Sequence, residues 1–147
     1  MTPDGISTED WDRVHELALQ VVNATTGDDE EASAAATRQI LTLLDDLERK
    51  YGPLPSLLAT RADYVETPSE RQHWWEAAHE QALARGDRKN LVWIAASLAE
   101  FHVAEMNDQI AGRTWVERAE RYLRDSPDSS EAESVKELRR TLDGQAQ

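Results

Sequence analysis

The stretch Leu91–Met106 reads LVWIAASLAEFHVAEM and is apolar on nearly every face over its first six residues. A helix that is apolar all round is typical of a fold's interior, with neighbours on more than one side. Sixteen residues that include two glutamates and a histidine are too short and too polar to cross a bilayer. Asp87 before the stretch and Asn107-Asp108 after it are typical helix boundaries. The pattern predicts that this helix lies at the centre of the molecule.

Six further stretches carry apolar residues three or four positions apart, the spacing of a helix with one buried face. The first three are a helix capped at Ser7-Thr8 and ended by Asn23–Gly27, a helix from the acidic run Asp28–Glu31 to Gly52, and a short helix over Pro55–Val65. The other three run from Pro68 to Arg85, over Gln109–Arg124, and through Val135, Leu138 and Leu142 to a frayed tail, Gly144–Gln147. The total is about seven helices, and no stretch shows the alternation that predicts a β-strand.

Turn and cap residues agree with this periodicity. Thr67-Pro68-Ser69-Glu70 has threonine at the N-cap, proline at the first helical position and glutamate at the third, which predicts a capping box. All five prolines fall at the N-terminus or at expected junctions, never inside an expected helix. The residues expected to face inward include Trp11, Val14, Leu17, Ala18, Val21, Val22, Ala36, Ile40, Leu43, Leu44, Leu47, Tyr51, Leu57, Leu58, Ala62, Val65, Trp74, Trp75, Ala78, Ala82, Ile110, Trp115, Ala119, Tyr122 and Leu123.

The expected fold class is all-α, with antiparallel helical hairpins stacked side by side in a single domain. Connections of two to six residues between the expected helices favour antiparallel neighbours. The domain is expected to comprise an N-terminal hairpin (1–52), two further hairpins (53–127), a C-terminal capping helix (128–143) and the frayed tail (144–147).

The second half of the chain resembles the tetratricopeptide repeat over roughly residues 54–127. The matching residues are Leu98-Ala99…His102 in the first helix of a pair, Gly112…Val116…Ala119 in the second, and Pro127 after it. The resemblance implies a right-handed array of hairpins with a concave groove that holds a peptide. Three features depart from the family pattern: the repeat spacing is nearer forty than thirty-four residues, His102 stands where an aromatic ring is usual, and Pro127 comes later than the pattern places it.

The chain is strongly acidic, with 29 Asp and Glu against 16 Lys and Arg and a formal charge of −13. This charge argues against binding to nucleic acid, whose phosphates require Lys and Arg, and against docking on an anionic membrane. It favours rapid encounter with a basic partner. No cysteine, secretory leader or membrane-length apolar run is present, so we expect a cytoplasmic protein.

Two histidines stand near carboxylates. Glu76 and His79 have the spacing of two ligands in a di-iron bundle, but a second such motif is absent, so His79 is expected to be a surface imidazole. His102 lies in the central stretch without an accompanying nucleophile, phosphate-binding loop or zinc motif, and is expected to fill a core position. We therefore expect no enzymatic activity, no metal and no cofactor.

One side of the central helix combines an aromatic residue with acids. Trp93, Glu100 and Val103 share a stripe distinct from the most apolar face of that helix. The family resemblance implies that this stripe faces the groove, with Asp63 and Glu66 at equivalent places in the preceding hairpin. An aromatic anchor among three acids suits a ligand that carries lysine or arginine. The alternative is that Trp93 packs against a flanking helix and the acids only solvate the surface.

These features predict a non-catalytic interaction module that binds a basic protein or peptide. Its sharpest form is a bacterial immunity or antitoxin protein that neutralises a cationic toxin domain. One alternative is an adaptor or chaperone that holds an extended peptide in its groove. Another is a metal protein or enzyme that uses His79 or His102 with nearby glutamates. A fourth is a homo-oligomer joined through an exposed apolar stripe, and the oligomeric state stays open.

Overall fold

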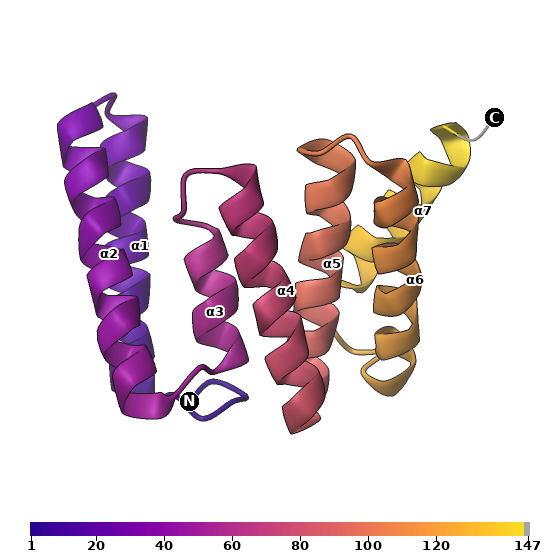
Figure 1. Cartoon of the computed structure of the whole chain (residues 1–147), viewed down its shortest axis with the longest axis horizontal. Helices are drawn as coiled ribbons and strands as arrows, with labels where there is room; N and C mark the ends of the chain where they lie inside the picture. Colours follow the sequence, from indigo (N-terminus) through magenta and orange to yellow (C-terminus); the bar gives the residue numbers. More distant parts are fainter. Residues whose placement is uncertain (146–147) are drawn as a thin grey trace.

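The computed structural model describes residues 1–145, which form helices and connecting turns without a β-strand (Figure 1). Its seven helices are α1 (Thr8–Thr26), α2 (Glu30–Tyr51), α3 (Pro55–Ala62), α4 (Pro68–Arg85), α5 (Arg88–Ala104), α6 (Gln109–Asp125) and α7 (Ala132–Gln145). The helices α1 to α6 pair as three antiparallel hairpins that stand side by side, and α7 packs across α5 and α6. The predicted all-α array of hairpins is confirmed.

Side-chain caps determine where most of the helices begin. Backbone N–H groups in the first turns donate hydrogen bonds to the side chains of Ser7, Asp29, Thr67, Asp87 and Asp108. Each such cap stabilises its helix by ~1 kcal/mol. The expected capping box differs in one bond, because Glu70 Oε1 accepts from the hydroxyl of Thr67 at 2.9 Å rather than from a backbone N–H.

Two helix ends differ from the prediction. α3 ends at Ala62 instead of Val65, because the N–H groups of Asp63 and Tyr64 bond to carbonyls three residues back and tighten the last turn. α7 continues to Gln145, so Gly144 and Gln145 are helical rather than frayed. The last two residues of the expected tail, 146 and 147, lie outside the described residues.

Two residues expected on buried faces are exposed. Ile110 is 83% exposed and Val22 57% exposed. In α6, Ile110 precedes the buried Gly112 by two residues, which places it about 200° away, on the opposite side of the helix. In α1, Val22 lies about 100° from Val21, which packs against the core. Spacing alone had assigned both residues to the wrong face.

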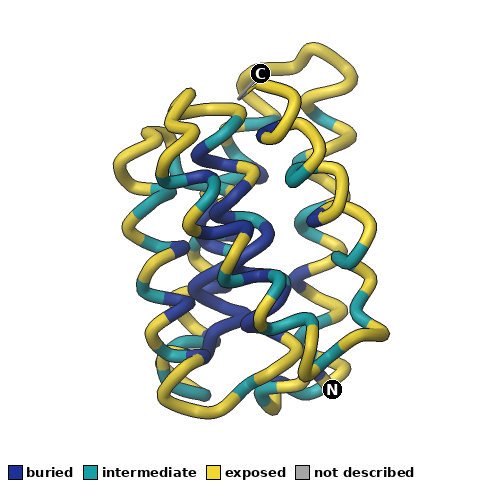
Figure 2. The backbone as a smooth tube through the Cα atoms, turned by 90° about the vertical axis from the view of Figure 1, so that its right-hand side faces the viewer, coloured by how far each residue is buried: buried dark blue, intermediate teal, exposed yellow. Residues whose placement is uncertain are grey.

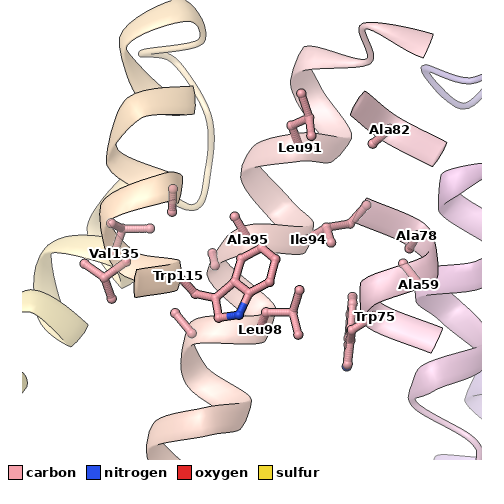
Figure 3. Close-up of a cluster of buried hydrophobic side chains, with 14 of the residues drawn as sticks. Ala59, Trp75, Ala78, Ala82, Leu91, Ile94, Ala95, Leu98, Trp115 and Val135 are labelled. Carbon is pink, nitrogen blue, oxygen red and sulfur yellow. The ribbon is translucent and has the colours of Figure 1, made fainter. Parts of the chain in front are cut away.

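The larger hydrophobic core is built around α5, which lies between α4 and α6 and also contacts α7. Ile94, Ala95 and Leu98 have no solvent-exposed surface. Trp75 and Trp115 approach from the helices on either side of Leu98 (Figure 3). Buried residues follow the middle of the fold and exposed ones its outside (Figure 2). The central position predicted for this helix is confirmed, and no helix in the described part of the chain has the length and apolarity needed to cross a membrane.

A second, smaller core holds the first hairpin together and reaches α3 through Leu54 and Leu57. Arg61 of α3 is 9% exposed and joins the two halves of the molecule. Its guanidinium donates to Asp45 of α2 at 2.6 Å, and the guanidinium carbon lies 4.9 Å from the ring centroid of Trp74 of α4. Contacts between the halves therefore concentrate along the short α3 helix.

Candidate functional site

A cleft of about 760 Å³ separates the first hairpin from the loop that joins α3 to α4; we call it the hairpin cleft. Its origin is a mismatch in helix length. α2 has 22 residues and α3 has 8, so at a rise of 1.5 Å per residue they span ~33 Å and ~12 Å. The N-terminal half of α2 is therefore not covered by α3, and the two hairpins diverge there (Figure 1).

Carboxylates line both walls of the hairpin cleft. Asp28, Asp29 and Glu30 lie at the turn between α1 and α2, and the opposite wall carries Glu66 and Glu70. The only basic side chain among the lining residues is that of Arg38. Within residues 1–145, none of these five carboxylates forms an ion pair. The cleft thus has an excess of negative charge that the described part of the chain does not neutralise.

The floor of the hairpin cleft is partly apolar. Leu41 of α2 and Tyr64 after α3 both line it and both pack against the smaller core. Burial raises the pKa of the Tyr64 phenol, and the negative charge of Asp63 raises it further. Tyr64 therefore stays neutral at physiological pH and offers an aromatic surface with a hydroxyl.

Arg71 fixes the second wall of the cleft. Its guanidinium donates to the backbone carbonyl of Val65 at 3.0 Å and to Glu105, the C-cap of α5, at 2.9 and 3.1 Å. The loop that carries Glu66 is thereby tied to α4 and α5. The carboxylates of the two walls accordingly sit on separate segments, and Arg71 braces the one that carries Glu66.

Two of the predicted groove residues do converge, in a separate cleft of about 230 Å³ between α3, α4 and α5. Asp63 and Glu100 line it together with Trp75, Arg71 and Glu105. Desolvation raises the pKa of the Asp63 carboxyl to about 6, although the positive charge of Arg71 acts in the opposite direction. Because Arg71 is already paired with Glu105, the carboxylates of Asp63 and Glu100 leave this cleft with a net negative charge.

The other three predicted groove residues lie elsewhere. Glu66 lines the hairpin cleft. The ring of Trp93 packs edge-on against Trp75, with centroids 5.8 Å apart, as the flanking-helix alternative expects, and Trp93 also lines a separate cleft of about 750 Å³ beside Asp125 and Asp128. Val103 packs against Gly112 of α6. The five residues therefore do not line one continuous groove.

The acids at the tip of the first hairpin were not among the predicted site residues. The acidic run Asp28–Glu31 was interpreted only as a helix N-terminus, and Glu70 only as part of a cap. One signal was available, because residues 1–51 carry twelve acidic and four basic side chains. What the sequence lacked was the spatial relation between this run and Glu66, which lies 35 residues beyond Glu31.

The surface position expected for His79 is wrong. Its side chain is enclosed between α4 and α6, with 8% of the residue exposed, and Nε2 lies 2.8 Å from the Tyr122 hydroxyl. Burial lowers the pKa of His79, the charge of Arg118 lowers it further, and Glu76 opposes both. The hydrogen bond between His79 and Tyr122 therefore joins α4 to α6.

His102 occupies the core position that was expected. It is 5% exposed, and its Nδ1 atom has no hydrogen-bond partner among the described residues. No group of three or more His, Cys, Asp or Glu side chains within residues 1–145 is arranged to hold a metal ion. His79 and His102 thus lie in separate packed environments.

Comparison with known proteins provides no relative for this chain: no family model, curated protein or solved structure matches it. The resemblance to tetratricopeptide repeats stays a prediction. A function is therefore inferred from the chemistry and geometry of the chain's own clefts.

Proposed function

We propose that this chain binds a basic protein or peptide in the hairpin cleft. The observation that carries the proposal is the set of five carboxylates that make no ion pair among the described residues and stand on two facing walls, opposed by the single guanidinium of Arg38. Like charges on facing walls repel one another, and a cationic group placed between them interacts favourably with both. An occupant with several Lys or Arg residues therefore gains from both sides of the cleft.

The floor of the cleft complements the long stems of such residues. Leu41, Tyr64 and Val65 present apolar surface below the acidic walls. Lysine and arginine bury their aliphatic stems along apolar surface while their charged ends reach toward carboxylates. Tyrosine at a partly buried position is also a typical binding hot spot.

The charge of the whole chain assists the encounter. A formal charge of −13 attracts a basic partner from a distance and raises its association rate. Charged contacts orient the partner and raise the association rate, while the apolar floor slows dissociation of the complex.

A cationic toxin domain belongs to the class of partner that this site suits. The proposal therefore includes the role of an immunity or antitoxin protein, in which binding blocks the partner's activity. The discriminating observation is whether a neighbouring gene encodes a protein with a basic C-terminal toxin-like domain. Its product would have to bind this chain and lose activity in the complex.

The direct test neutralises the cleft without changing its shape. In the triple variant Glu30→Gln, Glu66→Gln and Glu70→Gln, the last substitution keeps an acceptor for Thr67. Binding to octalysine is measured by calorimetry at low ionic strength. If each lost ion pair is worth about 0.2–1 kcal/mol, the triple variant binds about 3- to 150-fold more weakly.

The matched control removes the same charge elsewhere. Glu16, Glu80 and Glu137 are exposed and make no ion pair among the described residues. Their replacement by glutamine keeps the net charge equal to that of the cleft variant, and we expect a much smaller loss of affinity. Equal losses in the two variants would show that overall charge, and not the hairpin cleft, attracts the peptide.

A further inference from the structure

The hairpin cleft has the position of a missing helix. Beside the long α2 helix, the adjacent layer contains only α3, which leaves ~20 Å of α2 without a helical neighbour on that side. The loop after α3 occupies part of this length through Tyr64 and Val65. The remaining space along α2 corresponds to about three helical turns.

The side of α2 that lines the cleft allows a second helix to pack closely against it. Ser33, Ala34, Thr37 and Leu41 line the cleft at positions that follow one stripe of the helix. The first three side chains are small, so a neighbouring backbone can come within the 8–10 Å typical of packed helices. Ala36 and Ile40, by contrast, are buried, and Ile40 belongs to the smaller core.

We infer that the partner contributes an amphipathic helix of about three turns, with Lys or Arg along both flanks, which docks along the N-terminal half of α2. The inference rests on the proposed function and specifies the partner's form. The helix continues the layer begun by α3, and its apolar face covers Leu41, Tyr64 and Val65. Helix-in-groove docking is an established mode of peptide recognition.

The arrangement of charge favours such a partner over a second copy of this chain. The acids stand on both walls, so cations on both flanks of an inserted helix are neutralised while its apolar face points to the floor. A second copy would bring a further formal charge of −13 to an already acidic cleft. Like-charge repulsion of that size opposes self-association.

The experiment compares two peptides of identical composition. The first has about 14 residues of Leu, Ala and Lys, with the leucines at i, i+3, i+4 and i+7 on one face. The second contains the same residues in an order that scatters the leucines around the helix. Affinity is measured by calorimetry, and helix formation by the circular dichroism of the mixture minus that of its components. We expect the amphipathic peptide to bind at least about tenfold more tightly, with a gain in helix.

A pair of protein variants locates the site. Ala34→Trp fills the stripe that faces the cleft, and Gln39→Trp adds the same ring at an exposed position outside it. Both positions are exposed, so both variants are expected to fold, which circular dichroism verifies. We expect the first substitution to weaken binding of the amphipathic peptide at least about tenfold and the second to leave it unchanged.

The outcomes separate this inference from the proposed function. Equal affinity for the two peptides, with sensitivity to the Glu30, Glu66 and Glu70 substitutions, would overturn the helical partner and leave the acidic cleft as a binding site. If neither the amphipathic nor the scrambled peptide binds, and octalysine does not bind either, both the helical partner and the proposed function are overturned. A dimer of the free protein that dissociates on Ala34→Trp would identify a second copy as the occupant and would also overturn the inference. Tighter, helix-forming binding that is lost on Ala34→Trp supports it.

Discussion

A methyl carbon of Val103 on α5 lies 2.6 Å from the point that a Cβ atom at Gly112 on α6 would occupy. Glycine in a helix interior costs about 1 kcal/mol relative to alanine, so its presence here requires a compensating contact. The close approach of α5 and α6 is that contact, and it explains why Gly112 lies buried inside α6.

Gly112→Ala is expected to lower the free energy of unfolding by about 1–3 kcal/mol, because the added methyl overlaps the stiff, branched side chain of Val103. Urea denaturation measures the change. The double variant with Val103→Ala restores part of the loss, since it removes the overlapping methyl group. A stabilised Gly112→Ala protein would mean that the two helices are not held at this distance.

His79 is expected to make stability fall on acidification. Its pKa in the folded protein lies below the usual value, so below about pH 6.5 the unfolded chain binds more protons than the folded one and unfolding becomes more favourable. His79→Gln does not titrate and keeps a polar group for Tyr122. Relative to this variant, the wild type loses stability between about pH 7 and about pH 5. A difference that stays constant over this range would contradict the burial of the imidazole.

Asp63 is expected to have the opposite effect on the pH dependence of stability. Its pKa rises from 3.8 to about 6 on folding, so within that window the folded protein binds more protons and stability falls as pH rises. We expect Asp63→Asn to gain stability relative to the wild type as pH increases through the window. The gain stays below about 1 kcal/mol, because the partly exposed carboxyl is screened by solvent. Thermal unfolding at about pH 4 and about pH 7 measures it, and a gain only at the lower pH would have the wrong sign.

Association with octalysine is expected to weaken as salt is added, chiefly through a slower association rate. The Debye length shortens to about 8 Å at physiological ionic strength, which screens the attraction between the acidic chain and the peptide. Stopped-flow measurements at several salt concentrations separate the two rate constants. An association rate independent of salt would leave the charge of the cleft without a role in encounter.

Local signals in the sequence accounted for most of the fold. The caps Thr67 and Asp87 and the apolar stretch Leu91–Met106 are properties of a few neighbouring residues, and the structure places each in its expected role. The errors arose where spacing alone assigned a face. His79 was interpreted from its carboxylate neighbour, whereas its burial is determined by Trp115 and Tyr122, which arrive on α6.

The candidate site was less predictable, because it forms between two segments that are far apart in the sequence, the start of α2 and the loop after α3. The hairpin cleft exists because α3 stops at Ala62 beside the much longer α2. Glu66 was predicted as a binding residue, but its partners on the opposite wall come from the turn at Asp28 and Asp29. No periodicity within either segment records that the two face each other.

The most direct test of the central claim is a map of amide chemical-shift changes on titration with octalysine. The hairpin cleft predicts that the largest changes fall on residues 24–41 and 64–70, which carry its two walls. Changes concentrated instead on α6 and α7, or spread evenly over the surface, would contradict the assignment of the basic partner to this cleft.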